Sequence, residues 1–344
     1  MSRPATEPLL RALADPAERL LARSILGTDD PAVIAARVDA HCRSALGAGV
    51  VSVDFAEIST GAAFGLSLTD ERRVFFKAWT PATSTALLRD SHEVQSFLAA
   101  RGFPCPAVLA GPRPFGAGHA AIHEYRHEGD IGNARSPPLR AAMASALARL
   151  IAMAAPLRHL PDLRRPPPPD AVWPPPHNAL FDFEATRQGA EWIEAIAVAS
   201  REILLASAGP RVVGHWDWSA RNLRFRGEEV CIVYDWDSAG VDLETAFVGK
   251  TAIAFPMTWY GDEPEPFPSP EAAAAFVRDY ETARGRPFTA AERREIVAAA
   301  TYALSYTARC SHAIDPPGAV EAGSAGALLK LHAAGALADL LEHG

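Results

Sequence analysis

The chain has 344 residues, 49% of them apolar, which is enough for a large core or for two lobes of ordinary domain size. A formal net charge of -8 argues against a general binder of nucleic acid or anionic membrane, because such binders rely on patches of Lys and Arg. Four cysteines are scattered without a Cys-x-x-Cys pair, which predicts buried thiols and neither a disulfide framework nor a zinc site.

The first 48 residues predict a helical N-terminal segment. Between about Pro8 and Leu46, Leu and Ala recur at helical spacing, and the Asp-Asp-Pro of residues 29–31 is typical of a helix start. We expect two or three short helices here. Residues 1–27 contain neither the apolar stretch of a signal peptide nor a membrane span, so we expect a cytoplasmic protein.

The pattern changes to β-strand at Val50. Residues 50–58 alternate in polarity, residues 65–69 form a second short run and residues 74–79 a third, which predicts three antiparallel strands. Residues 59–65 would join the first two. Lys77 lies in the third run among aromatic and aliphatic residues, where an ammonium without an anion is costly. The alternative is a lysine whose tip reaches solvent.

A helix is predicted over residues 87–101, and Glu93 lies on it, sixteen residues after Lys77. A further strand over residues 120–125 ends at Glu124 and Tyr125. Three histidines near this strand are spaced by four residues, but on a strand successive ones would lie about 13 Å apart. The sequence therefore predicts no metal site there.

The remainder of the chain is mainly helical by its periodicity. Helices are predicted over residues 139–155, 191–206, 243–253, 272–283, 290–312 and 325–342. The proline-rich residues 161–176 predict a connection that wraps this part, with a ligand for an SH3-type domain as the alternative. Residues 255–271 form either a loop that lines a pocket or an ordinary surface excursion, and they include Trp259, Tyr260, Asp262 and Glu263.

The most informative stretch is residues 213–239, VGHWDWSARNLRFRGEEVCIVYDWDSA. His215, Asp217 and Asn222 form an H-x-D-x-x-x-x-N pattern, and Asp235 follows a short apolar run that predicts a buried strand. Phosphoryl transfer needs such a set, because one carboxylate takes the acceptor proton while an amide oxygen and a second carboxylate hold Mg²⁺.

A purely structural reading is available for each residue alone: a buried histidine at 215, a helix cap at 217 and a turn residue at 222. With Asp235 and Asp237 added, that reading would gather several acids beside buried strands without a cation to balance them. The pattern therefore favours a phosphoryl-transfer site.

The same segment resembles the catalytic region of the aminoglycoside phosphotransferase and choline kinase family, small-molecule relatives of the protein kinases. The usual form in that family is His-Gly-Asp-x-x-x-x-Asn, followed by Asp-Trp-Glu or Asp-Trp-Asp. Here Trp216 replaces the small residue, and Trp-Ser-Ala-Arg over 218–221 replaces the more common Leu-His-Pro-Gly. The resemblance covers roughly residues 50–248.

The resemblance implies a two-lobed, protein-kinase-like α+β fold. A helical preface over residues 1–48 would precede a small N-lobe over 49–125 with an antiparallel sheet. A mainly helical C-lobe over 126–344 would carry the catalytic loop and the acceptor site.

The resemblance also implies roles for individual residues. Asp217 is the catalytic base, Asn222 and Asp235 bind Mg²⁺, and His215 and Asp237 support them. The residues implied to bind ATP or GTP are Lys77, its ion-pair partner Glu93, Ser59, Thr60, Gly61, Glu124 and Tyr125. The candidate acceptor-binding residues are Trp216, Trp218, Trp259, Tyr260, Asp262 and Glu263.

The implied function is phosphorylation of a hydroxyl group of a small molecule by ATP, most directly an antibiotic. The alternatives are a metabolic kinase for choline, homoserine or a sugar, and a catalytically weak nucleotide-binding module. Because Trp216 and Trp218 flank Asp217, we expect a neutral or weakly charged acceptor. We expect no nucleic-acid or membrane partner, and a monomer or homodimer.

Overall fold

The computed structural model describes residues 6–176, 180–258 and 267–343. The chain divides into two compact units, residues 1–127 and 128–344. The first contains a five-stranded sheet with four helices, and the second is mainly helical, so the predicted α+β character is confirmed.

The sheet of the first unit is antiparallel, with strand order β1-β2-β3-β5-β4. Its strands are β1 (Val50–Ile58), β2 (Gly61–Leu68), β3 (Arg73–Trp79), β4 (Val108–Phe115) and β5 (Gly118–Glu124). Strand β2 begins four residues earlier than predicted, because Ala62, Phe64 and Leu66 alternate into the core. Ser59 and Thr60 alone therefore separate β1 from β2.

Strand β4 is not predicted from the sequence, since it contains Pro112 and Pro114. Proline lacks the N–H that a central strand must donate, so it is confined to sheet edges and bulges. The structure accommodates both prolines by placing β4 at the edge of the sheet, with register shifts against β5.

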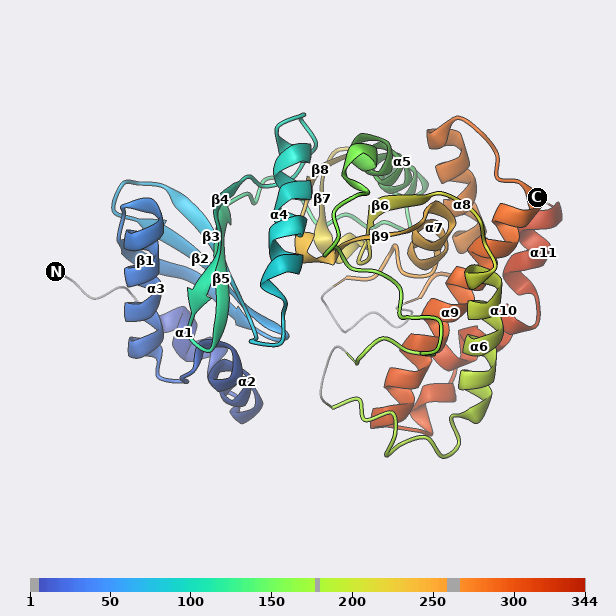
Figure 1. The fold of residues 1–344 in the computed structure, drawn as a ribbon, viewed down its shortest axis with the longest axis horizontal. Helices are drawn as coiled ribbons and strands as arrows, with labels where there is room; N and C mark the ends of the chain where they lie inside the picture. The colour runs from blue at the N-terminus through green and yellow to red at the C-terminus, as the bar shows by residue number, and fades with distance from the viewer. Residues whose placement is uncertain (1–5, 177–179, 259–266, 344) are drawn as a thin grey trace. The chain divides into compact units, whose positions relative to one another are not determined.

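Helices cover both faces of this sheet (Figure 1). The predicted helical segment consists of α1 (Glu7–Ala12), α2 (Pro16–Leu26) and α3 (Pro31–Leu46), whose apolar side chains share one core with the sheet. Helix α4 (Thr85–Ala99) covers the opposite face, where Leu88 packs with Trp79 and Ala121. Lys77 and Trp79 are two residues apart in β3, so their side chains lie on this same second face.

The second unit contains the helices α5 (Pro137–Ala154), α6 (Glu191–Leu205), α7 (Glu244–Ala252), α8 (Pro270–Arg284), α9 (Ala290–Ile314), α10 (Ala325–Ala333) and α11 (Ala336–His343). The single helix predicted over residues 325–342 is in fact two. Gly335 separates them with φ of 99°, a left-handed conformation that glycine adopts without strain.

Two small antiparallel pairs complete the second unit. Strand β6 (Arg211–His215) pairs with β9 (Ala239–Leu243), and β7 (Leu223–Arg226) pairs with β8 (Glu229–Val233). Strand β9 is not predicted, because its partner lies about two dozen residues away in the chain. It ends where α7 begins, so the predicted start at Leu243 is close to the helix observed.

The proline-rich segment packs against the second unit. Arg201 of α6 donates hydrogen bonds to the carbonyl oxygens of Pro167 and Pro168, and the Tyr302 hydroxyl of α9 donates one to Val172 O. These bonds support the predicted wrapping connection.

One helical stretch in the described part of the chain, residues 137–157, is long and apolar enough to cross a membrane by length and composition. Its residues Met143, Leu147 and Leu150 are fully buried within the protein.

Candidate active site

The loop that follows β6 is held against the segment that follows β8. The Trp216 N–H donates to Ser238 O at 2.8 Å, and the Tyr234 N–H donates to Asn222 O at 2.9 Å. His215, Asp217, Asn222 and Asp235 therefore lie at adjoining points of one framework, as the motif predicts.

His215 is 1% exposed and lies edge-on to the indoles of Trp218 and Trp236. Burial lowers its pKa against the attraction of Asp217, so the ring is neutral. Its Nδ1 accepts the Asp217 N–H at 3.2 Å, which leaves Nε2 protonated to donate to Tyr234 O at 3.0 Å. His215 thus fixes the start of the loop, which agrees with a supporting role.

Asp217 is half-buried and bonded through both carboxylate oxygens. Arg221 donates to Oδ1, and the Asn222 side-chain amide donates to Oδ2 and to the Asp217 carbonyl, each at 2.9 Å. Burial by itself raises the pKa of Asp217, but the charges of Arg221 and Lys250 outweigh it and hold that pKa below its usual range. Asp217 is therefore an oriented carboxylate.

Asn222 and Asp235 offer the oxygen atoms that a divalent cation prefers. Because the Asn222 amide nitrogen is committed to Asp217, its Oδ1 is the atom left to coordinate. Asp235 adopts a left-handed conformation, φ 63° and ψ 48°, and its Oδ2 accepts the Ser238 hydroxyl at 3.2 Å. Non-glycine residues in the left-handed conformation are strained, and they cluster at functional sites.

The described residues contain no group of three or more Asp, Glu, His or Cys side chains able to hold a metal. That finding fits Mg²⁺, which is commonly held by one or two carboxylates together with substrate phosphates. The donor set of Asn222 and Asp235 therefore suits Mg²⁺ bound with a nucleotide. Asp237 is half-buried next to this pair, and its carbonyl accepts from Arg164 at 2.6 Å.

Trp216 and Trp218 lie in different environments. The Trp216 indole packs on Phe247, and Lys250 Nζ lies 5.0 Å from the centre of its ring. Trp218 is 2% exposed and donates from its indole nitrogen to Met143 O of α5. The prediction that Trp218 binds the acceptor is therefore wrong, because its side chain belongs to the core. Trp216 stays a candidate.

The four other candidate acceptor-binding residues, Trp259, Tyr260, Asp262 and Glu263, lie outside the described residues. The chain immediately before them is attached to the catalytic loop by two main-chain hydrogen bonds. The N–H groups of Ala220 and Arg221 donate to Phe255 O and Met257 O, each at 2.9 Å.

In the first unit, Lys77 is half-buried in β3, and its Nζ lies 5.4 Å from the centre of the Trp79 ring. It does not project freely into solvent. Its place on the face covered by α4 is compatible with binding a phosphate.

The predicted partner of Lys77 is corrected. Glu93 is exposed, and the described residues give it no ion pair. Helix α4 buries residues 88, 91, 92, 94, 95 and 98, a helical stripe that leaves Glu93 exposed on the other side of the helix. Asp90, one turn earlier on α4, is half-buried and is better placed to face the sheet.

The remaining predicted nucleotide-binding residues lie at two ends of the sheet. Ser59 and Thr60 are exposed at the tip of the β1–β2 hairpin, and the Ser59 N–H donates to Gly61 O at 2.8 Å. At the end of β5, the Glu124 N–H donates to Ala107 O, and Tyr125 is covered by the Arg73 guanidinium at 4.1 Å.

Two cations near Asp217 are not predicted as site residues. Arg221 lies four residues after Asp217, so its proximity could have been read from the loop spacing. Lys250 is on α7, and the sequence carries no local signal that brings it to Trp216.

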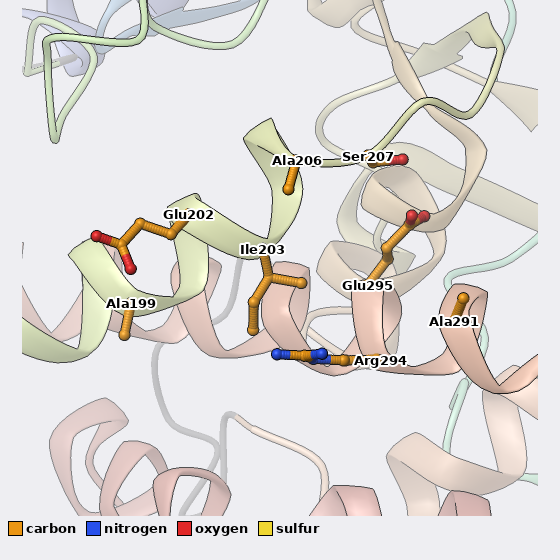
Figure 2. A pocket seen from close by; sticks show the side chains of 8 residues that line it. All are labelled: Ala199, Glu202, Ile203, Ala206, Ser207, Ala291, Arg294 and Glu295. Carbon is orange, nitrogen blue, oxygen red and sulfur yellow. The ribbon is translucent and has the colours of Figure 1, made fainter.

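A surface pocket of about 580 Å³ lies between α6 and α9 (Figure 2). It is lined by Ile203, by small residues and by the charged Glu202, Arg294 and Glu295. The Glu295 carboxylate accepts the Thr245 hydroxyl at 2.8 Å and so has a structural partner. The pocket contains none of the residues of the catalytic loop.

Comparison with known proteins agrees with this geometry. Residues 55–296, well over half of the chain, match the model of the phosphotransferase enzyme family. A search of curated proteins finds no match.

Three solved structures are similar. An amicoumacin kinase in complex with AMP-PNP, Ca²⁺ and Ami is 12% identical, with a TM-score of 0.58 over 83% of this chain and 88% of that one. An ethanolamine kinase of Plasmodium vivax is 12% identical, with a TM-score of 0.54 over 98% and 99%.

The third is a thermostable aminoglycoside phosphotransferase mutant in a ternary complex with ADP and hygromycin B. It is 13% identical, with a TM-score of 0.52 over 89% of this chain and 98% of that one. At such low identities the likeness concerns the fold, and it confirms the predicted kinase-like α+β fold.

Proposed function

This chain belongs to the phosphotransferase enzyme family, and we propose that it transfers a phosphoryl group from ATP to a hydroxyl of a small molecule, with Asp217 as the base. The observation that carries this proposal is the state of Asp217. It is ionised, half-buried and aligned by Arg221 and Asn222.

The chemistry follows from that state. As the acceptor oxygen forms its bond to the terminal phosphorus of ATP, the hydroxyl proton passes to the Asp217 carboxylate and ADP leaves. His215 keeps the loop in place through its two hydrogen bonds. A neutral histidine suits this role, since it adds no charge beside the carboxylate.

We propose that Asn222 and Asp235 hold Mg²⁺, with Asp237 in support, and that Lys77 contacts the nucleotide phosphates. When bound, Mg²⁺ neutralises the phosphate charge that opposes attack by the acceptor. The residue pair supports this assignment through its donor chemistry and through the left-handed backbone of Asp235. GTP is the alternative nucleotide.

For the acceptor we propose a hydroxylated antibiotic, supported by the two similar structures that are antibiotic kinases. The similar ethanolamine kinase supports the alternative, a metabolic kinase. The cytoplasmic location and the monomeric or homodimeric state stay predictions.

The test is a screen for ADP release against antibiotics and primary metabolites, with the mass of each product determined. The proposal expects an acceptor-dependent release and a product heavier by one phosphoryl group. Tight binding of Mg²⁺ and ATP without turnover on any acceptor would instead indicate a nucleotide-binding module.

A further inference from the structure

The two residues before Asp217 direct their side chains to different surroundings. His215 lies against Trp218 and Trp236, and its pKa responds to Asp217, Asp235 and Asp237. Trp216 lies against Phe247 and Lys250 of α7. Asp217 therefore adjoins two groups of side chains: an acidic side with His215, where we propose Mg²⁺, and a second side formed by Trp216 and α7.

The second side carries positive charge. Lys250 is half-buried, and the described residues give it no ion pair, only the face of the Trp216 indole. Burial, together with the charges of Arg221 and Arg164, lowers its pKa to about 8 against the attraction of Asp217 and Asp242. At neutral pH most Lys250 side chains are still charged.

Other partly buried cations of this unit have an oxygen partner: Arg201 donates to the carbonyl oxygens of Pro167 and Pro168, and others pair with a carboxylate. Arg140 pairs with Asp279 at 2.7 Å, and Arg284 pairs with Glu244 at 2.7 Å. A half-buried ammonium without such a partner bears a desolvation cost that an anion would offset. Arg221 adds a second cation, and Asp217, with which it pairs, must also serve the acceptor hydroxyl.

We infer that Lys250 and Arg221 bind an anionic group, a phosphate or a carboxylate, on the acceptor that Asp217 deprotonates. The inference rests on the proposed function, because it assumes that the acceptor lies beside Asp217. It narrows the acceptor class: polycations and quaternary amines would meet like charge here, whereas a hydroxy acid or a sugar phosphate would meet two donors.

The anion has a second conceivable source, the phosphoryl group in transfer. The structure favours the acceptor, because Lys250 Nζ lies 5.0 Å from the centre of the Trp216 ring and its charge interacts with Asp217, the proposed base. The experiment separates these two sources.

The first measurement uses inorganic phosphate as the probe, with the nucleotide site saturated by Mg²⁺ and AMP-PNP. We expect calorimetry to show phosphate binding to the wild type that weakens about tenfold in Lys250→Met, the loss of one charge-assisted contact. Lys330→Met is the matched control, because Lys330 lies 5.2 Å from the centre of the Trp192 ring on α10 and α6, and it should bind phosphate like the wild type.

The second measurement compares acceptors in matched pairs, such as a hydroxy acid and its amide, or a sugar phosphate and its free sugar. The wild type should show a KM about tenfold lower for the anionic member, and Lys250→Met should erase that preference. Lys250→Arg, which keeps the charge, should retain it.

Three results would overturn the inference. The first is that the wild type binds no phosphate in the presence of AMP-PNP, and the second is that Lys250→Met binds phosphate as tightly as the wild type. The third is that Lys250→Met lowers kcat equally for both members of an acceptor pair, which would assign the lysine to the phosphoryl group. Failure of the proposed function looks different, since no acceptor would then be phosphorylated, whether or not AMP-PNP binds. Phosphate binding measured without nucleotide would then still decide the anion site.

Discussion

Replacing Asp217 with Asn should remove the base while leaving the loop in place. The two side chains have the same shape, and the backbone bonds from Asp217 to His215 and from Asn222 to Asp217 do not involve the carboxylate. The carboxamide oxygen can still accept a hydrogen bond. What is lost is the negative charge, the capacity to take a proton and one of the two acceptors, because the carboxamide NH2 replaces an oxygen that accepts from Arg221 or Asn222.

The expected effects on rate and stability differ widely. Loss of a positioned base lowers kcat by about 10²–10⁴, or about 3–5 kcal/mol in the activation barrier. The ion pair with Arg221 is partly solvated, since Asp217 is 25% and Arg221 27% exposed, so its loss should cost at most about 1 kcal/mol of stability.

Asp279→Asn provides the control. Asp279 pairs with Arg140 at 2.7 Å, and the two side chains are 23% and 15% exposed, so the same charge is removed from a similar ion pair. The assay measures kcat with the acceptor found in the screen, the affinity for Mg²⁺ and ATP by calorimetry, and Tm. Asp217→Asn should lose turnover while binding ATP normally, and Asp279→Asn should keep both. Wild-type turnover in Asp217→Asn would refute the assignment of the base.

Three further predictions concern the metal ligand, the packing of Trp216 and a buried histidine. Asp235→Asn keeps a residue that tolerates the left-handed backbone but loses the charge, so the Mg²⁺-dependent gain in ATP affinity, measured by calorimetry with and without EDTA, should fall about tenfold or more. Gly240→Ala would place a Cβ 2.2 Å from Trp216 Nε1 and should lower the free energy of unfolding by about 1–3 kcal/mol. The control is Gly111→Ala, whose Cβ would meet nothing within 4 Å and should change the denaturant midpoint little. Equal shifts of the midpoint in the two variants would contradict the described packing of Trp216. Burial lowers the pKa of His332 to about 4, so between pH 6.5 and 4 the unfolded chain takes a proton that the folded protein refuses, and up to about 3 kcal/mol of stability is lost as the pH falls. His332→Met should abolish that part of the acid sensitivity, and an unchanged difference between the pH 7 and pH 4.5 midpoints would count against it.

The parts of the site that the sequence could predict are close together in the chain. Asp217 and Asn222 lie five residues apart in one loop, and the run before Asp235 is a strand that pairs with the segment starting at Leu223. Spacing alone therefore brings these groups near one another. The alternating pattern of β1 and β3 and the periodicity of the long helices are local in the same sense.

What the sequence could not predict depends on distant partners. The prolines of β4 are tolerated because the strand lies at the edge of the sheet. Strand β9 forms because its main chain pairs with β6. Trp218 is a candidate binding residue by its place beside Asp217, but its indole donates a hydrogen bond to Met143 O of α5 and lies in the core. Lys250 reaches the site only through the packing of α7. The acceptor expected from the two tryptophans beside Asp217 was neutral or weakly charged, whereas the anionic acceptor that we infer depends on Lys250.

The attachment of the catalytic loop to the chain after α7 has a consequence for how this enzyme can diversify. The bonds from Ala220 and Arg221 to Phe255 O and Met257 O are formed by main-chain atoms alone. Substitutions at the two carbonyl positions change side chains without removing an acceptor, so the loop keeps its alignment while the sequence beyond Met257 varies. A lineage could in this way exchange one acceptor for another by altering the following residues, with no compensating change at Asp217.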